Sequence, residues 1–339
     1  MKIKKQTALT ALAFAVSLVL SACGGGGGSG SSTPASTTAP PSGAGSANSA
    51  TSANVSTPQY ASGSAQLAAF NLLNQQRQQC GFPALTENTQ LDQAAAAHAT
   101  YEQALNLSTD TEVSGNPGFT GTAYTDRAVH FGFPGGIGVG GVSGGLYGPT
   151  TNEAQYGQSL IYYFLAGVYH APAMMDPVTD VGVGEVDKSS NGATAVWASL
   201  SFANLQSMTT SGPLTFPCQG TTGVAYEGVT EDPTPPNTNG SWGTPLTVIG
   251  NPTDTIVLQS ATLTDTSGHV IMLQLLDSAN DPNKELQPYE ASAYPTSALS
   301  PNTTYSAAIT GTIAGASCTA STPCAWSRNF SFTTGSEIQ

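Results

Sequence analysis

The stretch that most limits what this chain can fold into is residues 24–63. It consists almost wholly of Gly, Ser, Ala, Thr and Pro, and it contains no acidic or basic side chain. Such a segment buries too little apolar surface to offset the conformational entropy that folding removes. We therefore expect a flexible tether over residues 23–63, with the folded part beginning at residue 64.

A secretory signal peptide precedes the tether. Three lysines among the first five residues are followed by an apolar run, residues 8–20, that is too short to span a membrane between soluble flanks. The run ends in Leu-Ser-Ala-Cys, which resembles the bacterial lipoprotein box. This resemblance implies a signal peptide of residues 1–22, lipidation of Cys23 and membrane attachment through that anchor. Gly24, standing where aspartate would retain the protein in the inner membrane, implies the outer membrane of the cell envelope. An ordinary signal peptide with a chance cysteine is the alternative.

Charge excludes some partner classes. The formal net charge is −13, and loss of three lysines with the signal peptide takes it to −16. Nucleic acid and anionic membrane surfaces are poor partners for such a chain. Only 9% of the residues are charged, which is typical of an extracytoplasmic surface protein more than of a cytosolic enzyme.

Four cysteines remain besides Cys23, an even number in an oxidising compartment. Three pairings are possible. We favour Cys318–Cys324 as a local link and Cys80–Cys218 as a link between an early helix and the end of one domain. Metal binding by four thiolates is the rival interpretation, but no CxxC pair exists.

Helical patterning comes first after the tether, and strand patterning follows it. Apolar residues at helical spacing predict helices at 65–81, 90–106 and 153–168. Runs rich in β-branched residues predict strands at 180–186 and 194–202. The glycine-rich stretch at 134–145 is expected to form no long regular element. This order indicates an α+β domain, which we place at residues 64–218.

The pattern changes after Cys218 to short β-branched runs separated by Pro, Asn, Asp and Gly. Such runs predict a β-sandwich. We place a linker at residues 219–242 and the sandwich at residues 243–339. Its closing segments, SPNTTYSAAITGT and SRNFSFTTG, resemble the last strands of bacterial immunoglobulin-like or fibronectin-type modules.

Four segments of the first domain resemble the CAP superfamily (cysteine-rich secretory, antigen 5 and pathogenesis-related proteins) in its bacterial SCP-like extracellular branch. They occur in the family's order and at about its spacing, over residues 65–205: NLLNQQRQQCGFPALTENTQLDQAAAAHA at 71–99, PGFTGTAYTDRAVHFGF at 117–133, YHAPAMMDP at 169–177 and DVGVGEV at 180–186. The resemblance implies an α-β-α sandwich.

The resemblance also implies a cavity with two histidines, which in some members hold a divalent metal between acidic partners. His170 falls at one of these histidines. The second is missing, because the segment before PGFTG reads LSTDTEV and offers only Asp110 and Glu112. The family's Gly-Glu-Asn segment is also missing, and Glu153 is the next acid that could reach the cleft.

These residues give a reduced candidate site. We take His170, Asp110 and Glu112 as candidate catalytic residues, His170 and Glu153 as candidate ligand-binding residues, and His170 and Asp110 as candidate metal ligands. No cofactor is certain. A divalent metal such as Zn²⁺ is the possible one, although one imidazole makes a weak site because Zn²⁺ takes three or four protein ligands.

Other chemical motifs have plainer interpretations. His98 in an alanine-rich helix is expected to satisfy buried carbonyls, His130 to lie in packing or on the surface, and His269 to be solvated. His170 itself could serve only to cap the third helix. Ser143 fits the nucleophile motif G-x-S-x-G, but its glycine flanks favour a chance match.

The leading interpretation is a non-enzymatic envelope lipoprotein whose CAP domain binds a small apolar or glycan ligand, or a partner protein. The runner-up is a metal-dependent hydrolase or peptidase that uses His170 with Asp110 or Glu112. A purely structural surface protein is the third. Fold analogy cannot choose among them, because function resides in sites.

Overall fold

The computed structural model of this chain describes residues 11–12, 53–210, 212–315 and 318–336. Cys23, most of the predicted signal peptide and residues 23–52 of the predicted tether lie outside these ranges, so the signal peptide and the lipidation stay predictions. No helix within the described ranges is long and apolar enough to cross a membrane.

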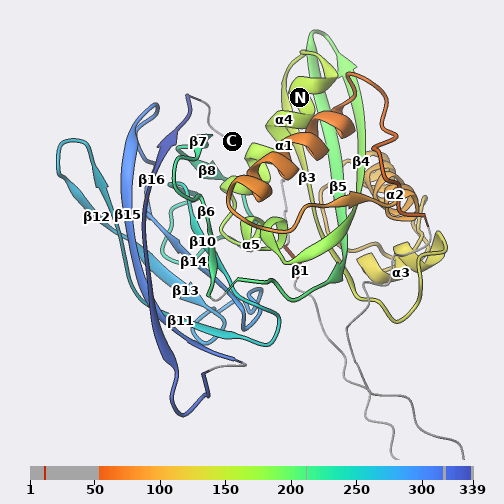
Figure 1. Cartoon of the computed structure of the whole chain (residues 1–339). Helices are drawn as coiled ribbons and strands as arrows, with labels where there is room; N and C mark the ends of the chain where they lie inside the picture. The colour runs from red at the N-terminus through yellow and green to blue at the C-terminus, as the bar shows by residue number, and fades with distance from the viewer. Residues whose placement is uncertain (1–10, 13–52, 211, 316–317, 337–339) are drawn as a thin grey trace, which may run out of the picture.

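The N-terminal part is a five-stranded sheet with helices on both faces (Figure 1). The strand order is β1-β3-β5-β4-β2, in which β3, β5 and β4 are antiparallel neighbours and β2 runs parallel to β4. The strands are β1 Ala11–Leu12, β2 Thr86–Glu87, β3 Val139–Pro149, β4 Val178–Ser190 and β5 Ala193–Leu205.

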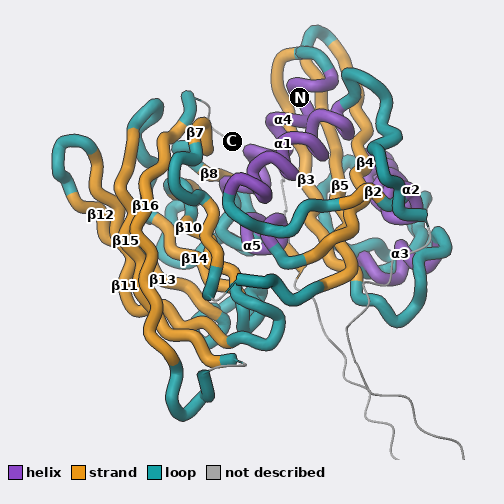
Figure 2. Tube along the Cα trace, viewed as in Figure 1, coloured by secondary structure: helices purple, strands orange, loops and turns teal. Residues whose placement is uncertain are grey.

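Two groups of helices cover the two faces of this sheet. Helices α2 and α3 pack on one face, and α1, α4 and α5 pack on the other, as the purple helices and orange strands of the Cα tube in Figure 2 also show. The helices are α1 Ala65–Gln79, α2 Thr89–Leu105, α3 Tyr124–His130, α4 Glu153–Ala166 and α5 His170–Met175. The layered α+β architecture predicted from the sequence is confirmed.

Local capping explains where the predicted helices begin. The side chains of Ser64, Asn88 and Asn152 accept backbone N–H groups at the starts of α1, α2 and α4, which satisfies donors that a helix leaves unpaired. Helix α4 ends at Ala166. His170 does not cap it but begins the separate short helix α5.

The expectation for the glycine-rich stretch is wrong, because its second half is part of β3, an eleven-residue strand. Glycine is required there by close packing. A Cβ at Gly141 would overlap the carbonyl oxygen of Leu200 and the ring of Tyr124. The glycines therefore let this strand lie against its neighbours, whereas composition alone indicates irregular structure.

The C-terminal part contains two main sheets, with strand orders β13-β14-β10-β6 and β12-β11-β15-β16-β7, and the short pair β8-β9. The main sheets share a core of apolar side chains. The strands are β6 Leu214–Phe216, β7 Thr222–Val224, β8 Gly228–Val229, β9 Ser241–Trp242, β10 Leu246–Ile249, β11 Thr255–Asp265, β12 Val270–Met272, β13 Gln274–Asp277, β14 Glu290–Tyr294, β15 Thr304–Ala314 and β16 Cys324–Thr334.

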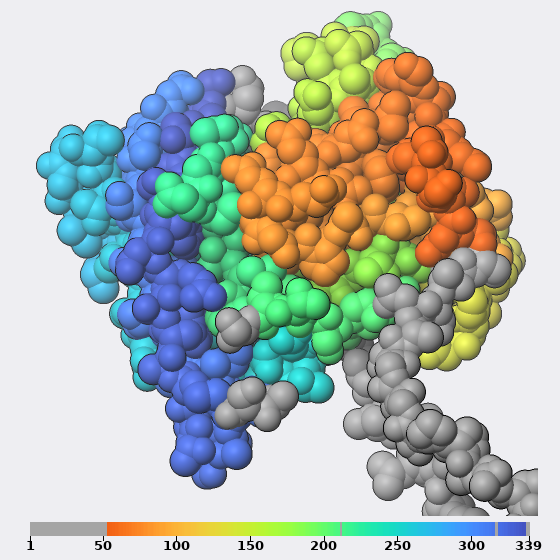
Figure 3. All heavy atoms as spheres, in the orientation of Figure 1, coloured from red at the N-terminus to blue at the C-terminus, as the bar shows by residue number. Residues whose placement is uncertain are grey.

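The two parts are joined more closely than the expected linker suggests. Strand β6 precedes Cys218 and already pairs with β10, while β7, β8 and β9 lie within residues 219–242. Helix α5 contacts β10 and β14. In the space-filling view, the green middle of the chain lies between the orange first helices and the blue last strands (Figure 3).

Both favoured disulfides are present, and one of them strengthens this junction. Cys80–Cys218 links the end of α1 to the turn between β6 and β7, across 138 residues of sequence. Cys318–Cys324 closes a local loop before β16.

The end of the expected tether packs on the N-terminal part. The Tyr60 hydroxyl donates to Asp92 at 2.6 Å, and the N–H of Gln59 donates to Glu87 at 2.6 Å. Residues 59 and 60, which the sequence assigns to the tether, thus contact the N-terminal part, because uncharged side chains and backbone N–H groups can still find carboxylate acceptors there.

Candidate functional site

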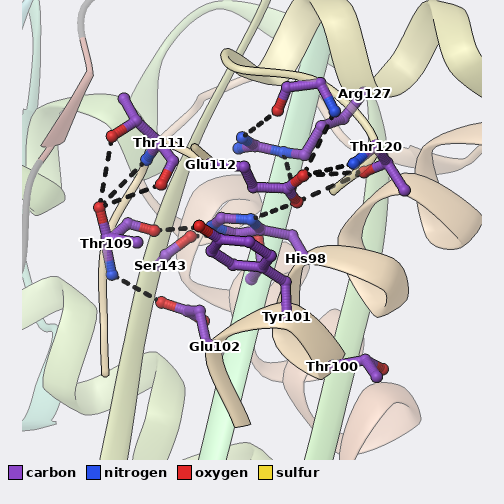
Figure 4. A network of polar contacts seen from close by, with 12 residues as sticks. His98, Thr100, Tyr101, Glu102, Thr109, Thr111, Glu112, Thr120, Arg127 and Ser143 are labelled. Atoms are coloured by element: carbon purple, nitrogen blue, oxygen red, sulfur yellow. Dashed lines mark hydrogen bonds and ion pairs between the residues drawn. The ribbon is translucent and has the colours of Figure 1, made fainter. Parts of the chain in front are cut away.

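A buried polar network occupies the space between α2, α3 and β3 (Figure 4). His98, on α2, is fully buried; its Nδ1 lies 2.9 Å from Oε1 of Glu112 and its Nε2 lies 2.6 Å from the carbonyl oxygen of Thr109. A carbonyl can only accept, so Nε2 carries a proton. Burial lowers the pKa of His98, and its bond to Glu112 acts in the opposite direction. The expectation that His98 satisfies a buried carbonyl agrees with this arrangement.

Glu112 is held from several directions. Its Oε2 accepts the N–H groups of Thr120 at 2.6 Å and Gly121 at 3.2 Å, and Oε1 lies 4.0 Å from Nε of Arg127. Burial raises the pKa of Glu112, but the bond to His98 and the N–H of Thr120 outweigh it, and the pKa falls below its ordinary value. This carboxylate is anchored in the network, so its predicted catalytic role has no geometric support.

Asp110 belongs to a neighbouring chain of hydroxyls. Its Oδ1 accepts the Tyr124 hydroxyl at 2.5 Å, and that hydroxyl lies 2.7 Å from Ser143, which donates to Ser199. Burial raises the pKa of Asp110 to about 7, although Tyr124 and the charge of His170 act to lower it. Ser143 lies inside β3 and not at a strand-to-helix turn, so it is not a nucleophile elbow.

His170 is paired with a residue from the C-terminal side of the molecule. Its Nδ1 lies 2.6 Å from Oε1 of Glu231, in the segment between β8 and β9. Glu231 also accepts the backbone N–H groups of Val168 at 2.7 Å, Tyr169 at 3.0 Å and His170 at 2.9 Å. Both side chains are almost completely buried, with exposed fractions of 3% and 2%.

Two buried polar atoms near this pair have no hydrogen-bond partner among the described residues: Nε2 of His170 and Oδ2 of Asp110. Glu285, from the C-terminal part, is half-buried nearby. Burial raises its pKa to about 7, and the charges of Asp110 and Asp281 add to that effect. The three side chains of Asp110, His170 and Glu285 thus influence one another electrostatically across the junction of the two parts.

The structure separates the remaining candidates. Glu153 is exposed at the start of α4, whereas His170 follows the other end of that helix, about 20 Å along its axis at 1.5 Å per residue. The expected pairing of Glu153 with His170 in one ligand site is therefore wrong in this fold. His130 and His269 are exposed.

No metal site stands out from these residues. Within the ranges that the structure describes, no three His, Cys, Asp or Glu side chains are grouped so that they could hold a metal ion. The expected pair of His170 and Asp110 would supply two ligands, which is fewer than Zn²⁺ takes in proteins. We derive no chemistry through a metal here.

Glu231, whose Oε1 lies 2.6 Å from Nδ1 of His170, is not among the residues that the sequence predicts for the site. Glu231 lies in the acidic, proline-rich stretch EGVTEDPTPP that resembled a linker. A single acid in a low-complexity segment carries no signal of its own. The one usable signal was that the sequence assigns His170 to a cavity but offers no acidic partner for it at the expected position.

No family model matches this chain, and no curated protein matches it. Among solved structures, an extracellular protein containing an SCP domain from Bacillus anthracis, determined at 1.5 Å resolution, is similar with 16% sequence identity and a TM-score of 0.29. The similarity covers 41% of this chain and 40% of that chain, less than half of either.

Proposed function

We propose that this protein is an extracytoplasmic, CAP-like lipoprotein that acts by binding a partner protein and not by catalysis. The observation that carries the proposal is the closure of His170, whose side chain is 3% exposed and is hydrogen-bonded to a carboxylate of its own chain. The two disulfides fit an oxidising compartment. Lipidation of Cys23 would keep the protein at the cell envelope.

The recess beside His170 favours a protein over a small ligand. It is lined by Tyr163, Trp242, Gly167 and residues 228–231, and it leaves no room for a water molecule. A small apolar or glycan ligand could enter there only if residues 228–231 moved. A partner protein can instead use the outer surfaces of both parts.

Two measurements on the mature chain test the non-catalytic part of the proposal. We expect a calorimetric Zn²⁺ titration to show no heat that disappears in His170→Ala, and a panel of peptide and ester substrates to show no turnover. His170-dependent zinc binding or turnover would overturn it. Crosslinking in intact cells should recover the same protein from independent cultures, and recovery of none would contradict the binding role.

One observation favours a hydrolase as the second candidate. Glu231 accepts the proton on Nδ1 of His170, which leaves Nε2 as the basic nitrogen, and Oδ2 of Asp110 also lacks a partner among the described residues. A carboxyl with a pKa of about 7 and an imidazole nitrogen without a partner are the two kinds of group that acid–base catalysis uses, and the charge of this imidazole acts on the carboxyl. This candidate requires that His170→Ala and Asp110→Asn abolish turnover, while His269→Ala keeps it.

A further inference from the structure

The segment from β8 to β9, residues 228–242, covers the end of α4 and the start of α5. We call it the strap. Its Trp242 Nε1 donates to the carbonyl oxygen of Ala166 at 2.7 Å, and its Thr230 carbonyl oxygen accepts the Tyr163 hydroxyl at 3.3 Å. The strap thus satisfies a carbonyl that the C-terminal end of α4 would otherwise leave unpaired.

Four donors meet one carboxylate beneath the strap. Three are the backbone N–H groups of residues 168–170 and the fourth is Nδ1 of His170, all within 3.0 Å of the oxygens of Glu231. We call these donors the cradle. Hydrogen bonds to an ionised acceptor are about twice as strong as neutral ones, so the cradle is built for a carboxylate.

The backbone leaves space for this carboxylate through one glycine. A Cβ at Gly167 would stand 2.5 Å from Oε1 of Glu231 and 2.7 Å from Nδ1 of His170. The φ of Gly167 is −74°, which any residue can adopt, so its backbone conformation does not demand glycine. The missing side chain is what makes room for the carboxylate.

The rest of the strap is fastened less firmly than its carboxylate. Asp232, next to Glu231, is exposed, and Asn237, Asn239 and Gly240 are exposed as well. Besides Glu231, the strap is held by the buried Trp242 ring, by the buried Pro235 and by hydrogen bonds to Tyr163, Tyr294 and Gln274. Opening of the strap therefore requires release of these contacts as well as of the carboxylate.

From these contacts we propose that the strap is an intramolecular occupant of a carboxylate-binding cradle, and that the cradle takes an aspartate or glutamate side chain of a partner protein when the strap leaves. This inference rests on the proposed binding function and names the chemistry of its partner. Glu231 then acts as an autoinhibitory contact. Its release makes His170 and the N–H groups of residues 168–170 accessible together.

Chemical rescue tests the cradle in the full mature chain. Glu231→Ala leaves a gap of the size of acetate, so we expect a lowered Tm that sodium acetate restores at fixed pH, with sodium chloride at equal ionic strength as the reference. Wild type, the exposed neighbour variant Asp232→Ala and the filled variant Glu231→Gln should not respond specifically to acetate. If Glu231→Ala folds only with acetate, the folded yield replaces Tm as the readout.

Hydrogen exchange shows whether the strap moves. In Glu231→Ala, we expect at least tenfold faster exchange in residues 228–242 and at the N–H groups of residues 168–170, with unchanged protection at α2. Acetate should slow exchange at residues 168–170 alone. Equal protection in variant and wild type, or no acetate effect on Tm or exchange, overturns the cradle.

A peptide with blocked ends tests whether the cradle binds a side-chain carboxylate, because such a peptide has no terminal carboxylate. The heptapeptide Gly-Val-Thr-Glu-Asp-Pro-Thr, the sequence of residues 228–234, should slow exchange at residues 168–170 of Glu231→Ala, and a version with Gln and Asn at the two acidic positions should not. Rescue by acetate without an effect of the acidic peptide would overturn the partner assignment. Turnover or His170-dependent zinc binding would instead overturn the non-catalytic function, which these readouts do not measure.

Discussion

Two buried imidazoles in this molecule are each paired with a glutamate, and they differ in what else surrounds the pair. His98 and Glu112 lie inside the N-terminal part, and both ring nitrogens of His98 have partners. His170 and Glu231 join that part to the strap, and Nε2 of His170 has no partner among the described residues. The first pair is saturated, whereas the second can be opened by moving one segment.

The same chemical pair therefore lies in two different environments in this molecule. Arg127 stacks over the Tyr124 ring at 4.3 Å and donates to the carbonyl oxygen of Asp110 at 3.0 Å, so the His98 network closes on itself. Glu231 is also almost completely buried, but it lies in a segment whose next residue, Asp232, is exposed. Breaking the two pairs should therefore have different consequences.

The largest effect is expected for Glu112→Ala. This change leaves His98 and Arg127 buried without their carboxylate, and removing one partner of a buried ion pair costs about 3–5 kcal/mol. Glu231→Ala should cost less, about 1–3 kcal/mol, because the strap can move and let water reach the unpaired donors. Urea unfolding followed by circular dichroism measures both, with His130→Ala at the surface as the control. Equal losses for the two glutamates would break the comparison.

Replacing both Cys80 and Cys218 by serine should cost about 2–5 kcal/mol, since this disulfide closes a long loop. It joins α1 to the turn before the strap, so strap exchange should also rise. The matched control is the double replacement of Cys318 and Cys324, which are six residues apart and should give the smaller loss. Thermal unfolding measures the two losses, and the reverse order would contradict the loop argument.

Gly141→Ala tests the closed network without changing any charge. The added methyl group would overlap the Tyr124 ring, and overpacking of this kind costs about 1–3 kcal/mol. Gly148→Ala in the same strand is the control, because no atom lies within 4 Å of the place that its methyl group would take. Equal urea midpoints for the two variants would show that β3 can shift to make room.

The pH dependence of stability should show the contribution of Asp110. Burial raises the pKa of its carboxyl from 3.8 to about 7, so the folded state binds an extra proton in this range. Its contribution to stability is therefore present below about pH 4 and is lost as the pH rises through about 7. The stability difference between wild type and Asp110→Asn should fall from about pH 4 to about pH 8 in urea titrations. A flat difference would place the Asp110 carboxyl in a solvated environment.

The smallest effect on stability is expected for Cys23→Ser, because Cys23 is distant in sequence from the residues of both histidine–glutamate pairs. It should leave the unfolding midpoint unchanged while moving the protein from the membrane fraction to the soluble fraction. Cell fractionation with an immunoblot measures this, and a variant that stays in the membrane fraction would contradict lipid anchoring.

Much of the fold could be predicted from residues that act locally. The helices at Ala65–Gln79 and Thr89–Leu105 follow from apolar spacing, and capping side chains place their starts within a residue or two. The strand β3 could not be predicted, because its glycines are required by close contact with residues of α3 and β5. The close approach that selects glycine exists only after packing.

The candidate site was predictable in part. The charge of His170 acts to lower the pKa of Asp110, whereas Glu112 faces His98 and Glu153 lies at the far end of α4; the roles assigned to these residues stay predictions. Asp110 and Glu112 are two positions apart, and the loop between α2 and α3 turns their side chains to different partners. The spacing of the two residues in the sequence does not tell which way each side chain points.

By itself, the sequence determined the order of helices before strands and the residues that begin the helices, since composition, periodicity and caps act over a few neighbours. Only the tertiary structure decided that Glu231 meets His170, because that contact joins positions 61 residues apart. Such a contact forms when two parts pack and remove a carboxylate and an imidazole from water together. Its free energy depends on that burial, which no local pattern of residues encodes.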